Sequence, residues 1–209
     1  MGSDDLFKKR KENSLQKRSR GRLGKVRERI LILSEGECTE KNYFESFHLT
    51  NVVVKGLGFN TDSLISEAIK RKKEAKKEGT PYDQVWCVAD RDSFSTANVA
   101  RAFDLARSNG IRIAWSNEAF EFWFLLHFNY YDSAFSRTQY KRKLTELLKR
   151  EYCKEDPNHY QYILDKQVVA LANAKRLYES YASFHPIDCN PITTVDQLVL
   201  ELNQWKIKA

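Results

Sequence analysis

Between residues 30 and 130, short apolar segments alternate with amphipathic segments four times, and this alternation limits the fold more than any other feature. The apolar segments are ILILS, NVVVK, QVWCVA and IRIAW, which begin at residues 30, 51, 84 and 111. Their length and their β-branched residues predict buried strands. The segments between them place apolar residues at helical spacing. Strands joined by helices pair in parallel, so the sequence predicts an α/β fold with helices on both faces of a parallel sheet.

The chain divides into three parts by composition and pattern. Residues 1–29 hold eleven Lys and Arg against four Asp and Glu, a net charge of +7 that equals the net charge of the whole chain. This basic arm lacks apolar periodicity, so we expect it to be flexible and attracted to phosphate groups; a solvated tail or a protein-docking segment is the alternative. Residues 30–130 are expected to form the α/β core, and residues 131–209 a helical extension packed on that core. The candidate nucleic-acid-binding residues of the arm are Lys8, Lys9, Arg10, Lys17, Arg18, Arg20 and Arg22.

Several classes of protein are disfavoured by what the sequence lacks. It has no apolar run of the roughly eighteen residues that a membrane span requires, and its first residues do not resemble a secretory signal, so we expect a cytoplasmic protein without membrane contact. Gly56 and Gly58 are not followed by the Lys-Ser/Thr of a phosphate-binding loop, which disfavours an NTPase. No CxxC pair suggests a zinc site or a disulfide framework, because the cysteines are widely separated: Cys38, Cys87, Cys153 and Cys189.

Acidic residues follow three of the four predicted strands. Glu35 follows the first strand, Asp90 and Asp92 follow the third, and Glu121 comes shortly after the fourth. The carboxyl ends of parallel strands meet at one edge of the sheet, where ligands bind. Clustered carboxylates need a counter-charge, and oxygen ligands suit Mg²⁺ or Mn²⁺. The sequence therefore predicts a metal site at this edge, and Glu40 is a further candidate ligand.

Each of these acids also has a structural explanation, and the sequence alone leaves both open. Asp90 and Asp92 are typical turn residues. Glu40 would stabilise the first turn of a helix that Thr39 is suited to cap. Glu121 lies in the apolar segment AFEFWFLLHF, where a salt bridge to an arginine would satisfy it.

Four segments in order along the chain resemble the RloB family. They are EGECTEKNYF, VADRDSF, SNEAFEFWFLLHF and NPITTVDQLVLEL, and the resemblance covers nearly all of residues 28–205. That family is similar to Toprim domains, the fold shared by topoisomerases, primases and a class of nucleases. The resemblance thus implies a Toprim-like sheet, a role in bacterial defence against phage, and a partner ATPase of the RloA type.

The same resemblance implies roles for particular acids. Glu35 matches the Toprim glutamate after the first strand, and Asp90 and Asp92 match the paired aspartates after the third. Glu40 and Glu121 correspond to additional glutamates in nucleases with this fold, although Glu40 lies one residue further from Glu35 than in those nucleases. These correspondences imply that Glu35, Asp90 and Asp92 are catalytic and that all five acids are metal-ligand candidates.

The function expected from these features is hydrolysis of phosphodiester bonds in DNA or RNA, tRNA included, by a nuclease that uses Mg²⁺ or Mn²⁺. The main alternative is a non-catalytic or conditionally activated subunit of an ATPase defence complex. A third hypothesis is a small-phosphate hydrolase or transferase. It is weaker because the sequence lacks the pattern of a nucleophile with a lysine. Self-association is compatible with each of these functions.

Overall fold

The computed structural model describes residues 27–91 and 96–206, which include a five-stranded sheet of order β2-β1-β3-β4-β5. Four strands are parallel to one another: β1 (Ile30–Ser34), β2 (Val52–Gly56), β3 (Gln84–Asp90) and β4 (Arg112–Asn117). The fifth, β5 (Ile192–Thr193), runs antiparallel to β4. The predicted α/β fold is therefore confirmed, and the mostly parallel sheet is consistent with a Toprim-like fold.

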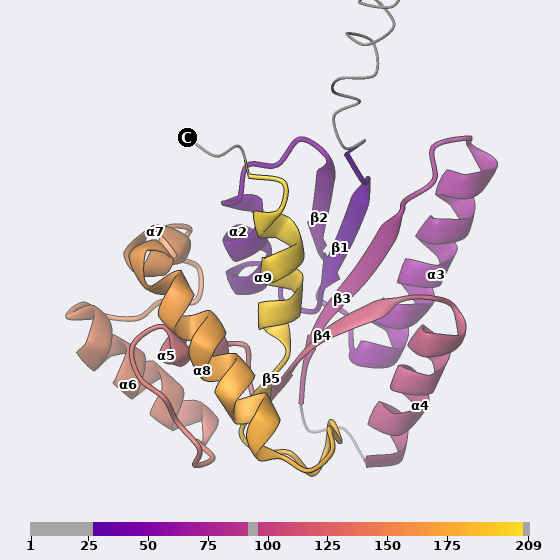
Figure 1. The fold of residues 1–209 in the computed structure, drawn as a ribbon. Helices are drawn as coiled ribbons and strands as arrows, with labels where there is room; N and C mark the ends of the chain where they lie inside the picture. Colours follow the sequence, from indigo (N-terminus) through magenta and orange to yellow (C-terminus); the bar gives the residue numbers. More distant parts are fainter. Residues whose placement is uncertain (1–26, 92–95, 207–209) are drawn as a thin grey trace, which may run out of the picture.

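Helices cover both faces of the sheet (Figure 1). On one side lie α3 (Thr61–Lys77) and α4 (Thr96–Ser108). The other side carries α2 (Thr39–Glu45), α5 (Glu121–Leu126), α6 (Arg137–Leu148), α7 (His159–Ile163), η1 (Leu164–Lys166), α8 (Gln167–Ser180) and α9 (Val195–Asn203). Strands enclosed in this way are apolar along their whole length, and every residue of β1 is buried.

The strand β5 is the element that the sequence did not predict, because only helices were expected after residue 131. Thr194 stands at the N-cap position of α9, but its side chain does not cap the helix: its Oγ1 accepts a hydrogen bond from the Trp115 amide (2.9 Å), and its own amide donates to the Trp115 carbonyl (2.8 Å). The hydroxyls of Ser116 and Thr193 lie 2.9 Å apart in a further hydrogen bond. A two-residue strand is too short to show a periodicity, so nothing in the sequence marks it.

An aromatic cluster fixes α2 against the helical part of the chain. The ring of Tyr43 packs against Phe120 (5.8 Å between centroids), Phe124 (5.6 Å) and Tyr160 (5.4 Å). These rings come from α2, from the start of α5 and from α7. The cluster therefore sets the position of the first turn of α2 relative to the first turn of α5, and both turns carry a candidate glutamate.

Within the part of the chain that the structure describes, no helix is both long enough and apolar enough to cross a membrane.

Candidate functional site

The sheet has a topological switch point between β1 and β3. From β1, the chain passes through α2 to β2 on one side and then returns through α3 to β3 on the other side. Because α2 and α3 lie on opposite faces, the carboxyl ends of β1 and β3 border a crevice in which α/β proteins bind ligands. Glu35 directly follows β1 and Asp90 ends β3, so the two acids stand at this crevice.

The position of Glu35 is fixed by both its backbone and its side chain. Its amide donates to the Val88 carbonyl (3.1 Å), and its carbonyl accepts from the Gly58 amide (2.9 Å). Its carboxylate accepts a hydrogen bond from the Thr61 hydroxyl through Oε1 (2.5 Å) and a longer one from the Asp90 amide through Oε2 (3.4 Å). The Glu35 carboxylate is therefore oriented toward the end of β3.

Glu40 reaches the same place from α2 because Gly36 has no side chain. A Cβ atom on Gly36 would lie 1.8 Å from Oε2 of Glu40, far inside van der Waals contact. Any other residue at position 36 would displace the carboxylate. Glu37, between them, is exposed and lines the same place.

The three acids line one cavity of about 320 Å³, which we call the carboxylate cavity. Its lining includes Glu35, Glu40, Asp90, Arg137 and Lys154. Arg137, the first residue of α6, places its Nη2 atom 3.4 Å from Oδ1 of Asp90. The helical C-terminal part thus brings positive charge to the acids at the edge of the sheet.

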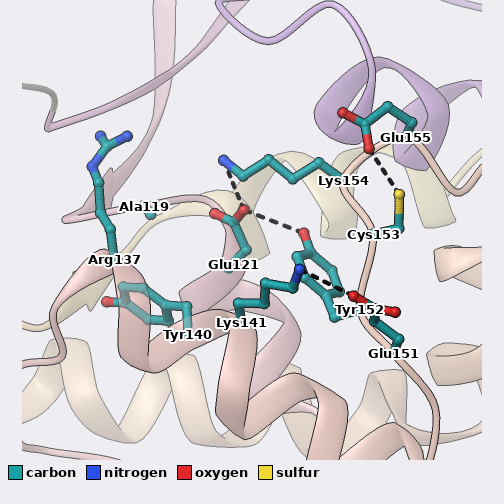
Figure 2. Close-up of a pocket in the computed structure, with 10 residues that line it drawn as sticks. All are labelled: Ala119, Glu121, Arg137, Tyr140, Lys141, Glu151, Tyr152, Cys153, Lys154 and Glu155. Atoms are coloured by element: carbon teal, nitrogen blue, oxygen red, sulfur yellow. Dashed lines mark hydrogen bonds and ion pairs between the residues drawn. The ribbon is translucent and has the colours of Figure 1, made fainter.

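Glu121 lies in a neighbouring cavity of about 540 Å³, which we call the tyrosine cavity after Tyr140 and Tyr152 in its wall. Figure 2 shows Lys154 reaching across to Glu121, with Nζ 3.0 Å from Oε1, while the Tyr152 hydroxyl donates to the same oxygen (3.2 Å). Only 4% of Glu121 is exposed. The burial and the adjacent carboxylate both raise the pKa of Tyr152, so its hydroxyl remains a donor. The expected salt bridge to an arginine is instead made by a lysine.

Lys154 lines both cavities, and the acids of both cavities affect its pKa. Burial alone would lower its pKa, but the negative charge of Glu121, together with Glu40 and Asp90, outweighs burial and raises it. Its carbonyl accepts a hydrogen bond from the Thr39 hydroxyl (2.8 Å), which the sequence had assigned to capping α2. Thr39 therefore ties the loop that carries Lys154 to the start of α2.

The sequence did not identify Arg137 or Lys154 as site residues. The chain contains 35 Lys and Arg, and neither of these two lies in a distinctive motif. The only available signal was the need of clustered acids for a counter-charge, which does not say where the counter-charge comes from.

Asp92 lies outside the described residues. So do the arm residues Lys8, Lys9, Arg10, Lys17, Arg18, Arg20 and Arg22.

The donor set of the carboxylate cavity has the chemistry of a site for a hard divalent cation, because all three acids offer carboxylate oxygens. Over residues 27–91 and 96–206, no three His, Cys, Asp or Glu side chains form a group that could hold a metal ion. Glu35, Glu40 and Asp90 thus share a cavity without converging on one point, and hydrogen bonds from Thr61 and an ion pair with Arg137 hold two of them.

A family model described as RloB-like protein matches residues 30–202. No curated protein matches the chain. The matched range runs from the first residue of β1 into α9, so it includes the residues of both cavities.

Proposed function

The chain belongs to the RloB-like family, and we propose that it is a metal-dependent nuclease that hydrolyses phosphodiester bonds in DNA or RNA. The observation that carries this proposal is the carboxylate cavity at the switch point of the sheet. Glu35, Glu40 and Asp90 come from the end of β1, from α2 and from the end of β3, and they line it together. Acids of separate elements gathered at a ligand-binding edge are typical of a site for a cation.

A Mg²⁺ or Mn²⁺ ion would be held by Glu35 and Asp90, with Glu40 and Asp92 as further ligands. Once bound, such an ion polarises a phosphoryl oxygen and lowers the pKa of its water. Glu121 has a different part in this proposal. It lies buried beneath Lys154 in the neighbouring cavity, so it positions the lysine.

The two cations at the cavity suit the phosphate of a nucleic acid. Arg137 offers a planar guanidinium, which can donate two parallel hydrogen bonds to phosphate oxygens. Lys154 offers a point charge that the surrounding acids keep protonated. Both would draw a phosphodiester toward the acids and fix its orientation beside Glu35.

A second candidate is a conditionally activated subunit of a complex with an RloA-type ATPase in cytoplasmic defence against phage. The observation that favours it is the pairing of site acids with cations from the C-terminal part, Asp90 with Arg137 and Glu121 with Lys154. A partner that shifted α6 or the loop before α7 would separate these pairs and change the charge of the site.

The experiment that tests the proposal measures cleavage of single-stranded and duplex DNA and RNA with Mg²⁺, with Mn²⁺ or with EDTA. It compares the wild-type protein with Glu35→Gln and Asp90→Asn, in the absence and presence of an RloA-type ATPase. The matched control is Glu45→Gln. Glu45 lies on α2 like Glu40, but its side chain is 49% exposed and pairs only loosely with Lys41 (4.0 Å).

We expect cleavage that needs the metal, disappears in Glu35→Gln and Asp90→Asn, and persists in Glu45→Gln. Unchanged cleavage in both site variants would show that the chemistry lies elsewhere. If no substrate is cut under any condition and yet the ATPase binds, the second candidate replaces the first.

A further inference from the structure

Phe59 is an exposed aromatic residue in the wall of the carboxylate cavity, with 42% of its surface accessible. Among the described residues, the other large hydrophobic side chains with comparable exposure lie on helices: Leu105, Leu164, Val168, Val169, Tyr178 and Leu200. Phe59 instead lies on the loop between β2 and α3, beside Glu35. Its ring contributes apolar surface to a cavity whose other residues are mostly charged or small.

The backbone on both sides of Phe59 is anchored, so the point from which its side chain leaves the loop is defined. Before it, the amides of Leu57 and Gly58 donate to the carbonyls of Ser34 (3.1 Å) and Glu35 (2.9 Å). After it, the Asn60 side chain accepts from the amide of Ser63 and caps α3 (2.9 Å). A pre-positioned aromatic ring loses little conformational freedom when a ligand stacks on it.

Thr61 and Gly58 connect this loop directly to the acid that the proposed function places at the reaction. Thr61 donates a hydrogen bond from its hydroxyl to the carboxylate of Glu35. Gly58, directly before Phe59, has a left-handed backbone conformation (φ 63°). A ligand on the ring of Phe59 therefore lies next to Glu35 and not at a remote surface.

The cavity thus presents an aromatic face, two cations and five carboxylates, of which Glu37 and Glu155 are exposed. A nucleotide presents a π-face on its base and negative charge on its phosphate. A base within a duplex is already stacked on its neighbours, whereas an unpaired base is free to stack on a side chain. Building on the proposed function, we propose that Phe59 is a stacking platform for an unpaired base, and that the substrate is a single strand or an unpaired segment whose phosphate lies between Arg137 and Lys154.

The experiment measures binding in EDTA, so that it does not depend on cleavage. Fluorescence anisotropy with labelled single-stranded and blunt duplex oligonucleotides, both DNA and RNA, compares the wild-type protein with Phe59→Leu and Phe59→Trp. Leucine keeps the apolar volume but has no π-face. The matched control is Tyr178→Leu, because Tyr178 is similarly exposed (40%) but lies on α8 and does not line the cavity.

We expect Phe59→Leu to weaken single-strand binding by about 10- to 100-fold, the usual effect of losing one stacked base, and to change duplex binding much less. Phe59→Trp should bind single strands at least as tightly as the wild type, and Tyr178→Leu should match it. In cleavage assays the loss in Phe59→Leu should appear in KM more than in kcat.

Two results would overturn the proposal: equal single-strand binding by the wild type and Phe59→Leu, or no oligonucleotide binding by the wild type. Binding that depends on Phe59 without cleavage in any metal would instead contradict the nuclease assignment and leave the stacking site in place. Cleavage that needs Glu35 and Asp90 but does not change in Phe59→Leu would support the nuclease assignment and contradict the stacking site.

Discussion

The carboxylate cavity and the tyrosine cavity are neighbours that share Arg137, Lys154 and Glu155, but Glu35 and Asp90 in the first differ in burial from Glu121 in the second. In the first, Glu35 and Asp90 are partly exposed and held mainly by an amide, a hydroxyl and a guanidinium. In the second, Glu121 is buried and its charge is matched by a lysine and a tyrosine.

This difference separates two uses of a carboxylate. A buried charge must be paired permanently, because leaving it unpaired costs several kcal/mol. A carboxylate that keeps some exposure, as Asp90 does with 15% of its side chain, can exchange one partner for another more readily. Substitutions in the carboxylate cavity should therefore impair activity more than stability, whereas substitutions around Glu121 should impair stability first.

The largest effect should come from Asp90→Asn. Under the proposed function, we expect the cleavage rate in Mg²⁺ to fall by about 1,000-fold, equivalent to about 4 kcal/mol of transition-state stabilisation. Because Asp90 is not fully buried, the free energy of unfolding should change by less than about 1 kcal/mol. Single-turnover cleavage and urea unfolding of the same preparations measure both. A large loss of stability with an unchanged cleavage rate would show that Asp90 has a structural role and would contradict the assignment of activity to the carboxylate cavity.

Low pH should lower the free energy of unfolding through a histidine at the end of α5, the helix that begins at Glu121. His127, at its other end, is only 1% exposed, and its Nδ1 lies 2.9 Å from the Trp123 carbonyl. Burial lowers the pKa of His127 to about 4, with a further lowering by Lys166 and an opposing effect of Asp165. The folded protein keeps this imidazole neutral, whereas the unfolded chain protonates it near its ordinary pKa of about 6.5.

The contribution of His127 to stability should therefore be complete above pH of about 6.5 and decline as the pH falls toward 4, by roughly 3 kcal/mol in total. Urea unfolding between neutral and acidic pH measures it, with His127→Gln as the comparison. The variant should lose less stability over this range than the wild type does. Parallel curves for the two proteins would show that His127 is not the group responsible.

Glu121→Gln should lower the free energy of unfolding by about 2 kcal/mol, since the ion pair with Lys154 is lost and the hydrogen bond from Tyr152 is no longer charge-assisted. Lys154, whose side chain is 60% exposed, can then be solvated, which limits the loss. The matched control is Glu151→Gln at the rim of the same cavity, where a 79% exposed side chain pairs with Lys141 and should matter little. Equal effects of the two substitutions would contradict the structural role of Glu121.

The smallest effect should come from Tyr152→Phe, which removes only the hydroxyl that donates to Glu121. We expect a loss of about 1 kcal/mol in urea unfolding, because the ion pair with Lys154 remains. Combined with Glu121→Gln, the loss should be less than the sum of the two single losses, since both substitutions act on one interaction. Strict additivity would mean that the two side chains stabilise the fold independently.

The parts of the fold that follow from local pattern were predictable. The four apolar segments became the parallel strands, and the rule that carboxyl ends meet at one edge put Glu35 and Asp90 side by side. The apolar segment AFEFWFLLHF contains α5, which begins at Glu121, so the acid stands at the very start of the helix.

The parts that depend on tertiary packing were not predictable. Lys154 reaches the acids because Thr39 holds its loop and because an aromatic cluster holds α7 against α2. Neither contact leaves a local signature, since the partners are far apart in the chain. Phe59 was not predicted as a site residue for a similar reason: an isolated aromatic residue in a loop can be assigned a role only once the cavity that it lines is known.

The strand β5 also determines when the fold can be completed. Ser116 of β4 and its partner Thr193 are separated by 77 positions, so a nascent chain displays the end of the β4 edge, Ser116 and Asn117, long before β5 has been synthesised. Contacts of such high sequence separation form late and slowly. Until then, unpaired amides and carbonyls of β4 are a template for pairing with another chain. Between synthesis of β4 and synthesis of β5, the end of the β4 edge is therefore open to pairing of this kind.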